Sequence, residues 1–162
     1  MIERILLAVD DSPDALAAAR LGVELAVGFG GELRVMHVVA DHEIDALLQT
    51  GATELDLAAR RESSAASVLA RVSDLARAQG VSVSTRLRQG EVARAVLDEA
   101  EEWPADLVIV GRSFRSISGE PYVGPQTRHI LELASRPVLV VPPHHREPPA
   151  RSRPGGTPAG SV

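Results

Sequence analysis

The chain has 162 residues, of which 44% are hydrophobic and only 2% aromatic, and its formal charge is −5. This length fits one domain with a core of Ala, Val, Leu and Ile, as in a sheet covered by Ala-rich helices. There is no Cys, and all 17 basic residues are Arg, which excludes thiol catalysis, thiolate metal sites, Schiff-base chemistry and a P-loop lysine. The negative charge argues against a protein whose affinity comes from nucleic-acid phosphates.

The first apolar run, Ile5–Val9, is typical of a short strand buried on both faces. A polar segment ends it, in which Ser12 is a favoured helix cap and Pro13 fits the first helical turn. We therefore predict that a helix follows. Glycines between Gly28 and Gly31 end this helix, whereas the glycines of a dinucleotide fingerprint must open one.

The remaining elements alternate between strands and helices. Apolar runs predict strands at Leu33–Ala40, Val81–Leu87, Leu107–Val110 and Val138–Val141. Helical spacing predicts helices at about 54–79, 91–102 and 126–134. The third strand alternates apolar and polar residues, as an edge strand should. A strand-to-helix connection usually takes about 2–6 residues, so the longer polar loop from Gly111 to Gly124 is expected to be functional.

This alternation predicts an α/β fold: a doubly wound, five-stranded parallel sheet with right-handed crossovers. In such sheets a ligand binds beyond the carboxyl ends of the strands, where the strand order reverses. If the order is 3-2-1-4-5, that point lies between the first and fourth strands. The segment Asp10–Ser12 would then meet the loop from Gly111 to Gly124.

The end of the chain differs in composition from the rest. Residues 143–162 are rich in Pro, Gly and Arg and offer almost nothing to bury, so we predict a domain over residues 1–142 and a disordered tail over 143–162. No apolar stretch approaches the ~18 residues that span a bilayer, and the N-terminus has no basic region followed by an apolar run. We expect a cytoplasmic location and no membrane partner.

Four segments carry a resemblance to a known family: ILLAVDDSPDA from Ile5, HVV from His37, VIVGRS from Val108 and SRPVLVVP from Ser135. Together they resemble the universal stress protein family over roughly Ile2–Pro142. The resemblance implies the 3-2-1-4-5 adenine-nucleotide alpha-hydrolase-like fold and, in one large branch, ATP bound at the switch point. It also implies a homodimer joined through the last strand, Val138, Leu139, Val140 and Val141.

In the nucleotide-binding branch, the loop after the fourth strand carries three spaced glycines followed by Ser or Thr. Gly111 and Gly124 match the first and third glycines, but Phe114 stands at the second and Pro125 at the Ser/Thr position. Glycine lets backbone N–H groups close on a phosphate, whereas Phe adds bulk and Pro supplies neither an N–H nor a hydroxyl. The phosphate loop is therefore expected to be degraded.

The other residues that the resemblance singles out are better preserved. It implies that Asp10 accepts hydrogen bonds from a base or ribose and that Val38 or Val39 flanks an adenine. Arg112 and Ser113, with the further Arg and Ser residues of the loop, suit the phosphates, although Glu120 opposes an anion. The alternative is that Phe114 and Tyr122 close the loop over an empty site. The expected ligand, where one binds, is ATP with Mg²⁺.

Other kinds of site find little support in the sequence. Gly119–Gly124 has the glycine spacing of a Walker A motif but lacks its Lys. The histidines do not show metal-ligand spacing, and no Ser lies in GxSxG. Asp10 and Asp11 are neighbours whose side chains point in opposite directions on extended backbone, so they are not expected to form an acid–base pair.

The sequence thus predicts a non-catalytic, homodimeric stress-response regulator with a switch-point pocket for an adenine nucleotide. Two alternatives stay open. One is a slow ATP-hydrolysing enzyme that uses the same loop, with Asp10 and Glu120 as the acidic residues near Mg²⁺. The other is a nucleotide-free interaction scaffold whose Arg- and Pro-rich tail docks a partner.

Overall fold

The computed structural model describes residues 1–12, 15–40, 54–112 and 123–142. Its elements are β1 (Arg4–Ala8), α1 (Ala15–Phe29), β2 (Glu32–Ala40), α3 (Glu54–Ala78), β3 (Val83–Gly90), α4 (Val92–Glu102), β4 (Leu107–Gly111), α5 (Pro125–Leu133) and β5 (Val138–Val141). Every strand and helix predicted from the sequence is present. Most bounds differ from the prediction by one or two residues, and β3 differs more.

The prediction of β3 at Val81–Leu87 was wrong in its bounds, because Val81 takes part in the turn that ends α3. Gly80 has a φ of +74°, and the backbone N–H of Val81 donates to the carbonyl of Ala76 at 3.0 Å. This is how a helix commonly ends at a left-handed glycine. At its other end β3 continues to Gly90, which lies opposite Ala40 at the end of the long strand β2.

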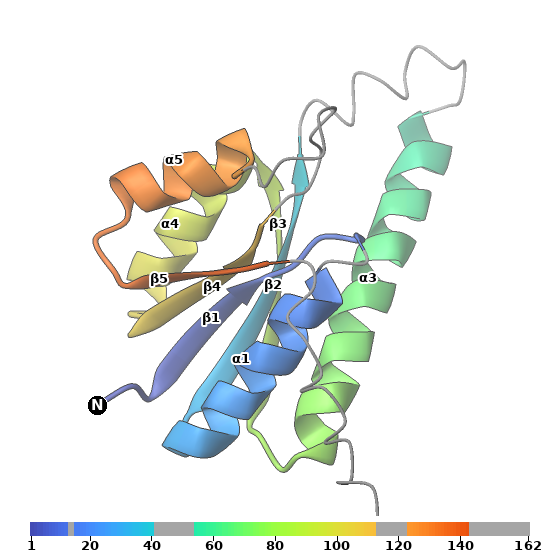
Figure 1. Cartoon of the computed structure of the whole chain (residues 1–162). Helices are drawn as coiled ribbons and strands as arrows, with labels where there is room; N and C mark the ends of the chain where they lie inside the picture. The colour runs from blue at the N-terminus through green and yellow to red at the C-terminus, as the bar shows by residue number, and fades with distance from the viewer. Residues whose placement is uncertain (13–14, 41–53, 113–122, 143–162) are drawn as a thin grey trace, which may run out of the picture.

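The five strands form one parallel sheet in the order β3-β2-β1-β4-β5, which confirms the predicted topology. Helices α1 and α3 cover one face and α4 and α5 cover the other (Figure 1). The chain leaves β1 for β2 and β3 on one side and then crosses to β4 on the other side of β1. The strand order therefore reverses between β1 and β4.

The central strand β1 is buried on both faces, as its continuous apolar run predicted. Ile5 and Leu7 pack with the core beneath α1 and α3, and Leu6 packs with the core beneath α4 and α5. All three side chains are fully buried. This buried central strand fixes the positions of the carboxyl ends of the strands, and therefore of the switch point.

A charged cluster joins the edge strand β3 to α4. Glu99 of α4 is only 1% exposed, and its carboxylate accepts hydrogen bonds from Arg34 Nη1 at 2.8 Å, Arg88 Nη2 at 2.6 Å and Arg86 Nε at 3.3 Å. The Arg34 guanidinium also lies 4.4 Å from the centroid of the Trp103 ring. Burial by itself would raise the pKa of Glu99, but the hydrogen bonds from Arg88 and Arg34 outweigh it and hold that pKa below its ordinary value.

Candidate functional site

Three predicted site residues, Asp10, Val38 and Arg112, lie at the carboxyl ends of β1, β2 and β4. Ala8 lies opposite Met36 of β2 and Val110 of β4. Continuing this parallel register by two residues places Asp10 between Val38 and Arg112. The edge where the strand order reverses therefore carries one acidic and one basic residue at aligned backbone positions.

Asp10 is held in place by the turn that leads into α1. Its Oδ1 accepts hydrogen bonds from the backbone N–H of Ser12, at 3.0 Å, and from the Ser12 hydroxyl. Ser12 Oγ in turn accepts from the Ala15 N–H at 3.3 Å, which confirms Ser12 as the helix cap. Asp10 is exposed, and its Oδ2 has no partner among the residues described. A fixed carboxylate with one oxygen left over is suited to accept a hydrogen bond from a ligand.

The β4 end of the site is formed by Gly111, Arg112 and Gly124. The Arg112 N–H donates to the Val141 carbonyl at 2.7 Å, and Arg112 Nε is buried with no hydrogen-bond partner in the described part of the chain. The Gly111 carbonyl accepts from Thr127 Oγ1 at 3.2 Å, and Thr127 is buried. Thr127 thus ties the start of α5 to the end of β4. The sequence reasoning missed this residue, which lies beyond the glycine motif.

Pro125 has a role that the loop motif did not reveal. Gly124 is the N-cap of α5, and Pro125 occupies the first turn of this helix, one residue before the predicted start. Pro is favoured there because the first N–H of a helix has no intrahelical partner. The sequence alone could have indicated this role, because Pro125 directly precedes the predicted helix. Pro125 therefore supports the helix even though it cannot donate to a phosphate.

Val38 and Val39, the two candidates for an adenine contact, lie on opposite faces of β2. Val38 packs against the core beneath α4 and α5. Val39 is buried and, by strand alternation with Leu33 and Val35, faces α1 and α3. His37 shares that face, and its Nδ1 lies 3.0 Å from the Val9 carbonyl, so it joins β2 to β1.

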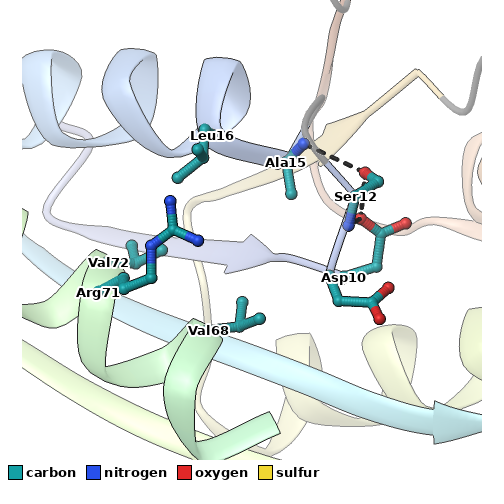
Figure 2. Close-up of a pocket in the computed structure, with 8 residues that line it drawn as sticks. Asp10, Ser12, Ala15, Leu16, Val68, Arg71 and Val72 are labelled. Carbon is teal, nitrogen blue, oxygen red and sulfur yellow. Dashed lines mark hydrogen bonds between the residues drawn. The ribbon is translucent and has the colours of Figure 1, made fainter. Parts of the chain in front are cut away.

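A small pocket opens beside Asp10 on the α1 and α3 face (Figure 2). The β1–α1 turn and the first turn of α1 form one side of it, and one turn of α3 forms the other. Its lining residues are Asp10, Asp11, Ser12, Ala15, Leu16, Val68, Arg71 and Val72. The volume accessible to water is about 20 Å³, enough for one or two water molecules at roughly 10–15 Å³ each. The contribution of α3, and of Arg71 in particular, was not predicted.

Several predicted residues lie outside the described ranges. Ser113, Phe114, Glu120 and Tyr122 belong to residues 113–122, and the predicted tail is residues 143–162. Among the residues that are described, no group of three or more His, Asp or Glu side chains is arranged to hold a metal ion. No helix within the same ranges is long and apolar enough to cross a lipid bilayer.

Solved structures share this fold. Protein MJ0577 aligns with 88% of this chain and 96% of its own at a TM-score of 0.71 and 22% identity. A universal stress protein in complex with cAMP aligns with 88% of this chain and 98% of its own, at a TM-score of 0.64 and 19% identity. The universal stress protein from Archaeoglobus fulgidus in complex with dAMP aligns with 87% and 98%, at 0.58 and 18%.

Sequence comparison identifies the family directly. Universal stress protein MJ0531 from Methanocaldococcus jannaschii is 26% identical over 141 residues, which cover 87% of this chain and 82% of the relative. Universal stress protein YxiE from Bacillus subtilis is 27% identical over 149 residues, which cover 87% and 99%. The model of the universal stress protein family matches residues 1–142. This chain therefore belongs to the universal stress protein family.

Proposed function

We propose that this protein is a non-catalytic, cytoplasmic stress-response regulator that binds an adenine nucleotide at the switch point between β1 and β4. The family and the two solved relatives in complex with cAMP and dAMP support this assignment. The observation that carries it is the buried Nε of Arg112, which lacks a hydrogen-bond partner among the described residues at the carboxyl end of β4. A buried donor without a partner costs free energy that a bound anion would recover.

In this assignment the β4 end of the site holds the phosphates. The Arg112 guanidinium donates to phosphate oxygens, and the N-terminus of α5 at Gly124 adds a favourable dipole. Pro125 supplies no N–H, so the side chain of Arg112 carries more of the phosphate contact than it would in a glycine-rich loop. Mg²⁺ arrives as the complex with ATP.

The β1 end of the site holds the nucleoside. Asp10 Oδ1 is occupied by Ser12, so Oδ2 is the oxygen that accepts from the adenine amino group or from a ribose hydroxyl. A hydrogen bond to a charged group contributes roughly 1.5–3 kcal/mol. Loss of this bond is expected to weaken binding by about tenfold or more, since 1.4 kcal/mol corresponds to a factor of ten.

Calorimetric titration with ATP and Mg²⁺ tests the proposal. We expect the wild-type chain to bind and Asp10→Asn to bind about tenfold more weakly, because the amide oxygen keeps the Ser12 contact while the amide nitrogen that replaces Oδ2 is a donor and cannot accept from the ligand. Glu24→Gln is the control, because it removes the same charge from an exposed position of α1 that does not line the pocket. ATP should be recovered intact after incubation. Absence of heat with millimolar ATP would contradict the proposal.

The proposed oligomer is a homodimer joined through β5. This strand is at the edge of the sheet, its partner is β4, and no described strand pairs with its outer side. Val138, Leu139 and Val140 are only half-buried. An apolar strand with a free edge readily pairs with another strand, and pairing with a second copy across a two-fold axis closes both edges at once.

A further inference from the structure

Helix α3 places an arginine at the pocket beside Asp10. Val68, Arg71 and Val72 are spaced by three and four residues, so they share one face of α3, and all three line the pocket. Figure 2 shows the Arg71 side chain extending from α3 toward Leu16 of α1. In the sequence, Arg71 is separated by more than twenty residues from the ends of β1 and β4 and from the glycine loop. The family motif does not include it.

The charge of Arg71 is not neutralised by a neighbouring carboxylate. Within the described ranges, seven arginines lie within 4.0 Å of a carboxylate oxygen: Arg4, Arg34, Arg77, Arg86, Arg88, Arg94 and Arg136. Arg71 and Arg112 have no such partner there. Asp74, one turn along α3 from Arg71, pairs instead with Arg77 at 3.3 Å. The two arginines that border the switch point are thus both left with unused donors.

The position of the pocket indicates which part of a nucleotide Arg71 would meet. Gly111, Arg112 and Gly124 lie on the β4 side of Asp10, whereas α3, which supplies Arg71, packs against β2 and β3 on the other side of β1. A nucleotide whose phosphates contact Arg112 and whose nucleoside contacts Asp10 would point its base toward α3. Leu16, Val68 and Val72 give this pocket an apolar wall, which suits the flat face of a base.

The pocket must open further before a base can enter, because its water-accessible volume is only about 20 Å³. Val72 is 2% exposed and fixed in the core, whereas Arg71 is exposed. Arg71 is therefore a long, exposed lining side chain that is free to move out and then lie back over the ligand. A guanidinium is planar, stacks on aromatic rings and donates to ring nitrogens.

We propose that Arg71 contacts the nucleobase of the bound nucleotide and covers the base pocket from α3. This inference rests on the proposed nucleotide site and adds to it a contact from an element that the loop motif does not include. A base gains affinity by stacking on a planar or cationic side chain, so removing the Arg71 side chain should weaken ATP binding by about five- to a hundredfold.

The test compares two ligands and three variants by calorimetry. ATP carries a base, and inorganic tripolyphosphate carries only the phosphates. Arg71→Ala should lose at least fivefold in affinity for ATP and none for tripolyphosphate. Arg71→Lys keeps the charge but not the planar group, so most of the loss should remain. Arg77→Ala is the matched control, because it removes the same charge from the same helix away from the pocket, and it should bind both ligands like the wild type.

Three results would overturn the inference. An equal loss for ATP and tripolyphosphate would mean that Arg71 acts on the phosphates through its charge. Unchanged or tighter ATP binding by Arg71→Ala, with the wild type binding normally, would remove the base contact and leave the proposed function standing. Failure of the wild type itself to bind ATP would remove both. Since Arg71 is exposed and forms no ion pair within the described residues, the melting temperatures of Arg71→Ala and Arg71→Lys should match that of the wild type.

Discussion

The two edges of the sheet are protected in different ways. At one edge, β3 is eight residues long, is largely exposed and carries Arg86 and Arg88, which are held by the buried carboxylate of Glu99. At the other edge, β5 is four apolar residues without a charge. Charged side chains on an edge strand discourage association with another strand, whereas a bare apolar edge invites it. The comparison indicates that a second copy of the chain would meet β5 and not β3.

The largest expected effect comes from a proline in β5. The carbonyls of Pro137 and Val141 face β4, since they accept from Val108 and Arg112. By alternation the N–H of Val140 faces outward. Val140→Pro should therefore remove a donor from the free edge, keep the bonds to β4, and convert the proposed dimer to a monomer in light scattering.

A proline one residue earlier provides the control for this experiment. The N–H of Leu139 faces β4, so Leu139→Pro should damage the sheet itself and lower the melting temperature. A Val140→Pro protein that remains dimeric would show that β5 does not join the copies. A wild-type monomer would have the same meaning.

The next effect concerns the β3 edge. Glu99→Gln keeps the shape of the side chain but removes the charge that three arginines surround. Breaking a buried ion pair typically costs about 3–5 kcal/mol, and the value here should be nearer 2–3 kcal/mol because these arginines are partly solvated. Chemical denaturation measures this loss. The exposed, single-partner Glu32→Gln is the control, and an equal loss there would contradict the role of burial.

The smallest effect is the pH dependence of the same cluster. The pKa of Glu99 is lower in the folded chain than in the unfolded chain, where it has its ordinary value near 4.5. The unfolded state therefore binds the proton first as the pH falls, and the contribution of Glu99 to stability is complete above that value and is lost below it. Stability curves of the wild type and Glu99→Gln should converge toward acid pH. A constant difference between them would refute this cause.

Local sequence patterns were sufficient for the strands, the helices and the parallel α/β class, and the family resemblance supplied the strand order 3-2-1-4-5. Each strand is a short apolar run, and the alternation with helices leaves few possible topologies. The bounds of β3 were wrong because the helix end at Gly80 takes Val81 away from an otherwise regular alternating run.

The Glu99 cluster and the Arg71 contact could not be predicted in this way. Arg34, Arg88 and Glu99 come from three separate elements, and each alone is typical of a solvated surface. In the sequence alone, Arg71 is likewise typical of the polar face of a helix. Its place at the pocket becomes evident only from the structure, in which α3 lies beside the β1–α1 turn. Such sites depend on which distant residues meet. The pattern of a single segment does not contain that information.

The hydrogen bond from the Arg112 N–H to the Val141 carbonyl links the proposed phosphate site directly to the proposed dimer strand. Arg112 would hold the phosphates, and Val141 ends the strand that would join the two copies. If pairing of β5 with its counterpart steadies that carbonyl, the dimer binds nucleotide more tightly than the monomer. Reciprocity then requires that nucleotide strengthen the dimer by the same factor. The dimer dissociation constant should therefore be smaller with ATP than without it. This difference would measure nucleotide binding through its effect on assembly.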